Sequence, residues 1–247
     1  MQVPQIRRAA STLVARQAAS TKPADKLGPC GGRITYPDFS HASGTTTATL
    51  AFENYCSNGT TAGVREIVNG RIAYVDIGTP TASGPVRTKL TANSPAGLAV
   101  ISRDAADKVL NSQLTTFTNF NSVVGVPGGA ATQAHPDAVS IDEITIVDKV
   151  ANKTYRQTGL NMSQFETATG SSQMTLSGRG YRSNGDYFDF STQVPLVSDS
   201  SGNTVSGTLA FTGSGGSVAV ATFVPGKVNQ ATVSVNGVAV TGLPACK

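Results

Sequence analysis

Hydrophobic and polar residues alternate in short runs along most of the chain, and the clearest runs lie between residues 174 and 222. Residues 174–178 and 187–191 flank an Asn-Gly pair at 184–185. Asn-Gly suits the type I′ turn of a β-hairpin, in which both central residues take positive φ. The same pattern returns in residues 208–212 and 217–222, with a glycine-rich turn between them. These runs predict consecutive antiparallel strands.

The alternation begins near residue 45. Ala48, Leu50 and Phe52 share one face of a predicted strand, and Thr47 and Thr49 share the other. One apolar and one polar face are typical of an antiparallel sheet. We predict a single all-β domain over residues 28–247, built as a large antiparallel meander sheet curled into a barrel-like or sandwich shape.

Turn residues divide this meander. Asn-Gly pairs at 58, 69, 184 and 236 each predict a turn, so residues 64–68 and 71–77 become two strands of one hairpin. Separate strands are predicted over 86–91 and 98–101, a helical turn over 104–113 and a loop over 126–136. Further strands are predicted over 114–124, 141–147 and 154–160.

Residues 1–27 differ from the rest and form a predicted basic arm, helical or flexible. Residues 4–19 are rich in alanine and lack acids. Three interpretations stay open: a flexible or docking arm, a helix for a membrane surface or partner, and an organelle transit peptide. The candidate assembly residues of this arm are Ile6, Arg7, Arg8, Leu13, Val14 and Arg16.

The charge distribution narrows the range of partners. The 247-residue chain has a net charge of +4, much of it in the arm, so the body is nearly neutral. Nucleic-acid binding needs a basic stripe, which the body lacks. No apolar run reaches the length of a transmembrane helix. The N-terminus also lacks the apolar core of a signal peptide, so export is an expectation from composition.

The three cysteines carry no metal, haem or redox motif, so we expect no cofactor and no metal. Cys30 and Cys56 flank the first two predicted strands and are disulfide candidates that would staple the start of the sheet. Cys246 stays free, pairs with one of the others or bridges subunits.

No group of residues has the pattern of a catalytic site. His41 and His135 are predicted in loops, each with an aspartate nearby but no Gly-x-Ser-x-Gly nucleophile motif. The carboxylate pairs available to a glycosidase are Asp142 with Glu143, Asp186 with Asp189, and Glu53 with Glu66. Alternation puts Asp142 and Glu143 on opposite faces. We predict that the chain is not an enzyme and has no catalytic residues.

Two further features have plainer interpretations. Residues 199–203 offer oxygen atoms to Ca²⁺ but lack the 12-residue loop of an EF-hand, so a turn is expected. The six tyrosines could stack on sugars, yet the chain has no tryptophan, and pairing on the sheet surface is the expected role.

Two stretches resemble a group of exported β-rich proteins of Gram-negative bacteria. Residues 44–56 followed by Asn69-Gly70 are similar to the opening of these proteins, and residues 187–195 and 205–217 to their closing segment. The resemblance implies an all-β fold and an exported location, and it carries over no catalytic residues. Many members continue into an acidic turn after the last strand, where this chain has Asn236-Gly237-Val238, so it implies no metal site here.

We expect an exported structural or adhesive protein at the cell surface, outside the cell or in the periplasm. Its expected partners are further copies of itself, as an oligomer or filament, or cell-surface components. Contact would run through sheet edges and the arm. One alternative is a ligand-binding module for glycans or lipophilic molecules, and another is an enzyme that uses the loop around His135.

Overall fold

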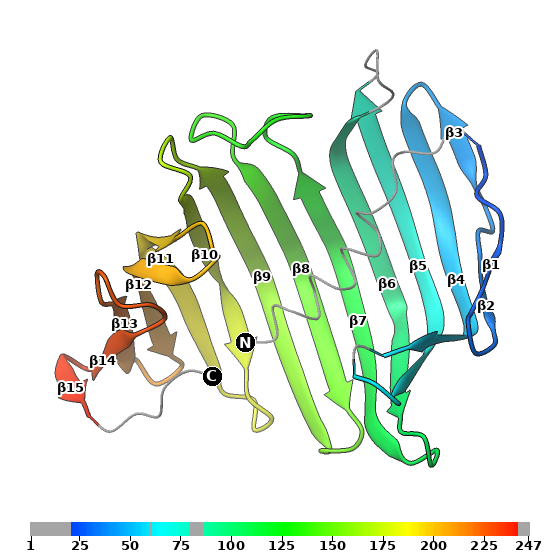
Figure 1. Cartoon of the computed structure of the whole chain (residues 1–247). Coiled ribbons are helices and arrows are strands. Elements are labelled where there is room, and N and C mark those ends of the chain that lie inside the picture. Colours follow the sequence, from blue (N-terminus) through cyan, green and yellow to red (C-terminus); the bar gives the residue numbers. More distant parts are fainter. Residues whose placement is uncertain (1–20, 60, 80–85, 242–247) are drawn as a thin grey trace.

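The computed structural model describes residues 21–59, 61–79 and 86–241, which fold into one sheet (Figure 1). No helix occurs in these residues. The strands are β1 (Lys26–Leu27), β2 (Arg33–Thr35), β3 (Ser40–Ala42), β4 (Thr45–Asn58), β5 (Arg65–Thr79), β6 (Val86–Arg103), β7 (Val109–Val123), β8 (Asp137–Asp148), β9 (Lys153–Glu166), β10 (Ser172–Tyr181), β11 (Tyr187–Ser198), β12 (Thr204–Gly213), β13 (Val218–Phe223), β14 (Ala231–Val235) and β15 (Val238–Val240).

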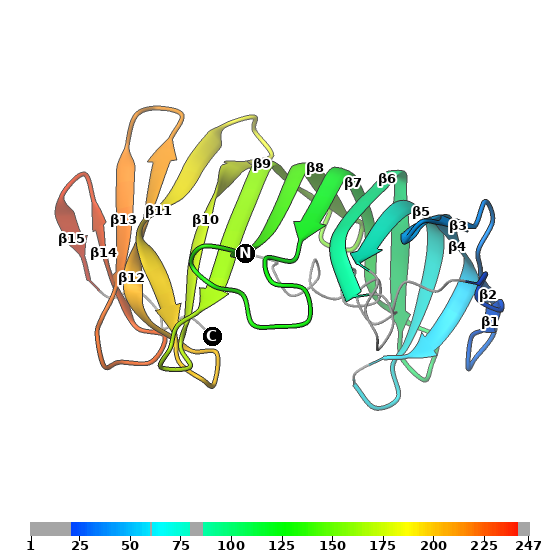
Figure 2. The same cartoon turned by 90° about the horizontal axis from the view of Figure 1, so that it is seen from above.

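The predicted all-β antiparallel meander is confirmed. The strand order is β1-β2-β4 and then every strand in sequence to β15, while β3 pairs with β4 beside β2. Seen from above, the sheet is curved into an arch with β1 and β15 at opposite ends (Figure 2). The two ends do not meet, so the sheet is open. It begins at Lys26, ahead of the predicted boundary at residue 28.

Two predicted strand divisions are wrong. Asn69-Gly70 lies inside the single long strand β5 and makes no turn. The predicted strands 86–91 and 98–101 are one strand, β6, which crosses Pro95 through a bulge. There, Asn93 pairs with Ala73 and Leu98 with Gly70, so β6 uses more residues than β5 over the same length.

The remaining turn predictions have mixed outcomes. Asn-Gly turns at 184–185 and 236–237 are confirmed between β10 and β11 and between β14 and β15. The predicted helical turn over 104–113 is wrong. Asp104 and Lys108 close a tight turn, and β7 begins at Val109. The predicted loop over 126–136 is confirmed, and β8 begins directly after it at Asp137.

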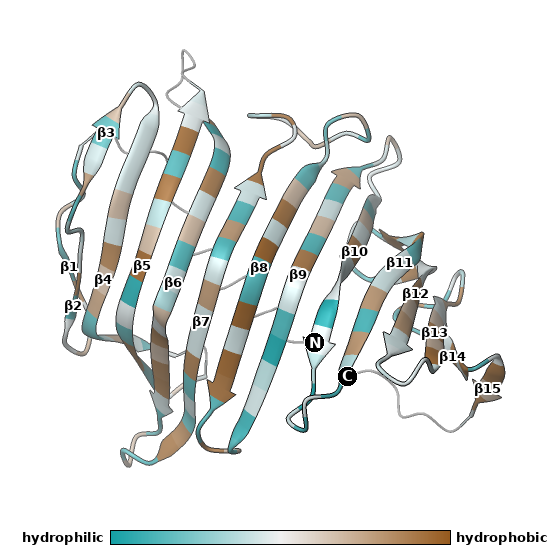
Figure 3. Cartoon of the chain, turned by 180° about the vertical axis from the view of Figure 1, so that it is seen from behind, coloured by the Kyte–Doolittle hydropathy of each residue, from teal (hydrophilic) through white to brown (hydrophobic). Residues whose placement is uncertain are grey.

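One face of the sheet carries the hydrophobic core, and we call it the apolar face. Ile72 and Leu90 on adjacent strands are only 2% and 1% exposed, and Tyr36 from the β2–β3 connection packs among them. Other members of this core are Ile34, Leu50, Phe52, Ala92, Leu98, Phe117, Phe120, Ile141, Ile144 and Ile146. Hydrophobic and hydrophilic residues alternate along the strands in Figure 3, as one buried face per strand requires.

The core spacing breaks strict alternation in several strands. Phe117 and Phe120 are three residues apart, yet both lie in the core with their rings 6.4 Å apart. A period of two would place them on opposite faces, so an extra residue must lie between them. Asn119 takes this place with φ of 50°. Asparagine is among the few non-glycine residues that adopt this left-handed conformation readily.

Asparagine side chains on neighbouring strands hold such positions in two separate groups, which we together call the asparagine row: Asn54 with Asn69, and Asn93 with Asn119 and Asp142. The amide oxygen of Asn69 accepts the backbone N–H of Asn54 at 2.7 Å, and Asn93 accepts that of Asn119 at 2.6 Å. The Asn119 side chain donates to Asp142 at 2.6 Å. The left-handed backbones of Asn54 and Asn119 are therefore each held by an asparagine on the neighbouring strand.

The C-terminal half of the apolar face uses aromatic rings over glycines. Phe190 lies opposite Gly178, and Phe188 lies opposite Gly180. A Cβ at Gly178 or Gly180 would meet the facing ring at 2.8 Å or 2.4 Å. The rings therefore occupy the space that side chains would take on β10.

We predict that the positive φ of Asn119 can be tested separately from its hydrogen bond to Asp142. Asn119→Gly and Asn119→Ala both remove the side-chain amide. In the left-handed conformation, however, only alanine has a Cβ atom that clashes with the backbone. We expect Asn119→Ala to be less stable than Asn119→Gly by about 1 kcal/mol in urea unfolding. Thr118→Ala, at the exposed neighbouring position, should change stability by less than about 0.5 kcal/mol. Equal stability of the two Asn119 variants would contradict this role.

Candidate functional site

The face opposite the core, here called the polar face, carries a line of short polar side chains across five adjacent strands. We call it the hydroxyl row: Asn121, Ser140, Asn161, Ser177 and Ser191. Each member pairs with the next in the strand register, from β7 through β8, β9 and β10 to β11. Because paired residues share a face, the five side chains point to the same side of the sheet.

The hydroxyl row lies in a hollow of about 490 Å³. Ala138, Ser163 and Thr175, from the next register row, extend its floor. Apolar residues also line it, at Val123, Val139, Met162 and Leu176. No ionisable side chain lines it.

The two asparagine amides of this row are held in place. Nδ2 of Asn121 donates to the carbonyl of Asn119, and Nδ2 of Asn161 donates to the carbonyl of Gly159, each at 2.9 Å. Each amide therefore keeps its Oδ1 as an acceptor with a fixed orientation. The hydroxyl groups of Ser140, Ser177 and Ser191 have no side-chain hydrogen bond to the described part of the chain, so they remain available to a ligand or to water.

A charged and aromatic group adjoins the hydroxyl row on the same face, on β8 to β11. We call it the arginine–tyrosine ladder: Glu143, Arg156, Arg179, Tyr181, Tyr187 and Asp189. Arg156 binds Glu143 through two hydrogen bonds of 3.0 and 2.9 Å, and Arg179 binds Asp189 through two of 2.7 and 3.0 Å. Both pairs are well exposed, so each adds little to stability.

The two guanidinium groups also lie over aromatic rings. The Cζ atom of Arg179 lies 3.9 Å from the ring centroid of Tyr187, and that of Arg156 lies 4.5 Å from the ring centroid of Tyr181. The two tyrosine rings are 6.3 Å apart. Bidentate pairing together with cation–π contact fixes these long side chains, which would otherwise sample many rotamers.

The ladder shifts the ionisation of its members. The hydrogen bond from Arg179 lowers the pKa of Asp189, and the hydrogen bond from Arg156 lowers the pKa of Glu143. A hydrogen bond to Thr158, followed by one to Arg179, lowers the pKa of Tyr181. Both carboxyl groups are therefore ionised at neutral pH, and the four charges of the ladder sum to zero.

The predicted disulfide between Cys30 and Cys56 is confirmed, with the two Cα atoms 5.1 Å apart. It joins the β1–β2 turn to the C-terminal end of β4, where the N–H of Cys56 also donates to the carbonyl of Gly31 at 2.9 Å. The bond closes a loop of 26 residues. It therefore fixes the first strands against the long central ones. Cys246 and the candidate residues of the arm lie outside the described residues.

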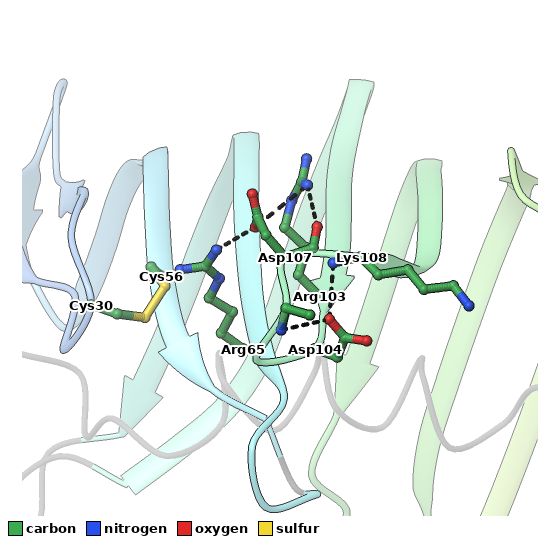
Figure 4. Close-up of polar contacts among 8 residues, drawn as sticks. Cys30, Cys56, Arg65, Arg103, Asp104, Asp107 and Lys108 are labelled. Carbon is green, nitrogen blue, oxygen red and sulfur yellow. Dashed lines mark hydrogen bonds and ion pairs between the residues drawn. A yellow bond between two sulfur atoms is a disulfide. The ribbon is translucent and has the colours of Figure 1, made fainter.

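Figure 4 shows a second charged cluster beside this disulfide. Asp107 accepts hydrogen bonds from Arg65 and, through its carbonyl at 2.9 Å, from Arg103. Asp104 caps the same turn by accepting the N–H groups of Ala106 and Lys108 at 2.9 Å. These contacts close the β6–β7 turn and tie it to the start of β5. The cluster therefore has a structural role in the turn, although the buried Nε of Arg65 has no hydrogen-bond partner among the described residues.

The two candidate histidines lie in different elements and have different partners. His41 lies in β3, so its predicted loop position is wrong, and its Nδ1 is 2.8 Å from the hydroxyl of Thr46. His135 lies in the β7–β8 loop as predicted, where its backbone N–H binds the loop residue Thr132. Within the described ranges, neither histidine forms a hydrogen bond or ion pair with a carboxylate.

The candidate carboxylate pairs are divided among other partners. Asp142 binds Asn119, while Glu143 binds Arg156. Asp186 accepts a hydrogen bond from Asn184 in the turn, and Asp189 binds Arg179. Glu53 pairs with Arg33 at 2.7 Å.

The segment around Asp199 forms the expected turn. Oδ1 of Asp199 accepts the N–H groups of Ser201 and Asn203 at 2.9 Å, and the backbone hydrogen bond with Asn203 is the main cause of its lowered pKa. Across residues 21–59, 61–79 and 86–241, no cluster of three or more metal-ligating side chains occurs.

Sequence reasoning singled out Asp189, Tyr181 and Tyr187 but missed the arginines that join them. The hairpin around Asn184-Gly185 could have predicted this arginine–aspartate pairing. Counting outward from its turn pairs Tyr181 with Tyr187 and Arg179 with Asp189, as observed. The hydroxyl row could not be found in this way because it needs the register of five strands.

Comparison of the chain with family models, with curated proteins and with solved structures gives no match in any of the three. In the described ranges, no helix has the length and apolar character needed to cross a membrane.

We predict that Arg179→Gln will raise the pKa of Asp189 back toward its ordinary value of 3.8. A lowered folded-state pKa stabilises the protein above the unfolded-state value, and this contribution is lost as the pH falls through the folded-state pKa. The stability difference between wild type and Arg179→Gln should therefore shrink on acidification below about pH 4. NMR titration of the Asp189 carboxyl carbon measures the shift. Arg182→Gln, in the adjacent turn, is the control. An unchanged Asp189 titration in Arg179→Gln would refute the assignment.

Proposed function

We propose that the protein is an exported structural or adhesive protein whose copies associate through the edges of the open sheet. The observation that carries this proposal is the exposure of apolar side chains on both terminal strands. Leu27 on β1 and Val238 on β15 are 77% and 70% exposed, the largest values among the large hydrophobic residues described. Val240 and Val235 on the last hairpin are also exposed.

The outer strand β15 lacks the usual protection of an edge. Edge strands commonly carry charged residues, proline or bulges that prevent pairing with another chain. β15 is Val-Ala-Val and has none of these. β1 carries Lys26, but its ammonium group lies 5.9 Å from the ring centroid of Tyr55. Both terminal strands thus support association through backbone hydrogen bonds and apolar contacts.

The strand directions are compatible with end-to-end association. Fourteen strands alternate in direction along the path from β1 to β15, so the two terminal strands run in opposite directions. A second copy placed in the same orientation beside β15 would present its β1 antiparallel to it. The meander would continue from copy to copy, and such a head-to-tail contact generates a filament. Short edges bury little area, so we expect association at high concentration.

The Cys30–Cys56 disulfide supports export, because such bonds form and persist in oxidising compartments. The same bond stabilises the end of the sheet that contains β1. Reducing conditions should therefore weaken this end, and assembly has to be measured without reductant.

We predict that Ala239→Pro will reduce self-association while leaving the sheet folded. Val235 and Val238 close a two-residue hairpin, so the next pair, Ser234 with Ala239, is a non-hydrogen-bonded pair. The N–H of Ala239 then points away from β14, toward an incoming strand. Proline removes this donor without breaking the ladder to β14. Light scattering over a concentration series and negative-stain electron microscopy would measure the effect.

Ala239→Ser is the matched control, because it keeps the N–H and a small side chain. It should assemble as the wild type does, with the far-UV circular dichroism of all three proteins unchanged. Wild-type protein that stays monomeric at millimolar concentration without reductant would refute the proposal. Filaments that survive Ala239→Pro would refute the role of the β15 edge.

A further inference from the structure

We infer that the hollow on the polar face of β7–β11 is a binding site for an uncharged oligosaccharide chain. This inference is independent of the proposed assembly, because it concerns a sheet face and assembly concerns the edges. It rests on the hydroxyl row, the fixed asparagine amides and the charge-balanced ladder that adjoins them.

The chemistry of the hollow favours hydroxyl groups as its ligand. Ser140, Ser177 and Ser191 offer hydroxyls that both donate and accept, and Asn121 and Asn161 offer amide oxygens held by their own backbone contacts. Val123, Met162 and Leu176 give the hollow an apolar part as well. A wholly lipophilic molecule covering the row would still leave these polar groups unpaired, which costs free energy. A sugar supplies matching donors and acceptors.

The spacing of the row favours a chain of sugars over a single one. Adjacent strands lie about 4.8 Å apart, so five strands present one polar side chain each over about 19 Å. Successive sugars of an extended pyranose chain repeat at a distance close to the spacing of adjacent strands, so each sugar can face one polar side chain of the row. Register pairing keeps the side chains in line, because each residue lies directly opposite the next.

The ladder along one side of the hollow favours an uncharged ligand. Arg156 with Glu143 and Arg179 with Asp189 each place a donor and an acceptor group side by side, which suits neighbouring sugar hydroxyls. The charges of the two pairs cancel, so the ladder lacks the excess positive charge that an acidic polysaccharide needs. Tyr181 and Tyr187 hold both arginines in place, so binding orders few side chains.

The experiment uses the full chain and named neutral polysaccharides. Native gels containing soluble starch, hydroxyethyl cellulose, mannan or xylan report binding as retarded migration, and calorimetry with an oligosaccharide of the retarding polymer gives the affinity. We expect at least one of these polymers to retard the wild type. Ser177→Phe fills the centre of the hollow and should weaken binding at least about tenfold. Arg156→Gln should weaken it several-fold.

Thr222→Phe is the matched control, because Thr222 is exposed on β13, outside the hollow. It should bind as the wild type does, and unchanged thermal unfolding of all variants would confirm that they fold. Ala239→Pro should also bind normally, which separates a failure of this inference from a failure of assembly. No retardation by any of the four polymers, undiminished binding by Ser177→Phe, or salt-sensitive binding to heparin alone would overturn the inference.

Discussion

The fold depends on one geometric constraint, which is that a two-residue alternation must keep a single apolar face over strands of up to 18 residues. Phe117 and Phe120 could not share that face in an unbroken strand. An extra residue within β7 resolves this conflict, and the asparagine row holds it in place. Asn119 supplies the left-handed backbone, and its side chain donates to Asp142 on the next strand.

The same constraint builds the candidate site on the other face. Ser140 and Glu143 are three residues apart, like Ile141 and Ile144 on the apolar face. The extra residue at Asp142 brings Ser140 and Glu143 to the same side of β8, and Gly159 with φ of 58° lies opposite it on β9. The hydroxyl row therefore lies directly beside the arginine–tyrosine ladder. The irregularity shared by β7, β8 and β9 therefore shapes both the core face and the candidate site.

The ends of the sheet behave differently from its centre. The first strands are tied by the Cys30–Cys56 disulfide and by the exposed Arg33–Glu53 pair. The last strands become progressively shorter from β12 to β15 and expose valines. A sheet that closed into a barrel would satisfy both edges. This one remains open, and the two proposals place partner contacts at its edges and on its polar face.

By itself, the sequence determined the fold class and the antiparallel pairing of consecutive strands. Alternation between turn residues predicted an antiparallel meander, and Asn184-Gly185 and Asn236-Gly237 located two of its hairpins. These features are local, because a hairpin forms between neighbours along the chain. The cysteine positions correctly suggested the Cys30–Cys56 disulfide, although only the fold brings the two residues within bonding distance.

Tertiary structure decided what local patterns left open. Asn69-Gly70 has a turn sequence, yet Asn69 binds Asn54 on the neighbouring strand, and β5 continues through it. Pro95 argues against a central strand, yet a bulge carries β6 past it. The hydroxyl row joins residues from position 121 to position 191. Such rows depend on the register of several strands, and that register is set by packing between segments far apart in the sequence.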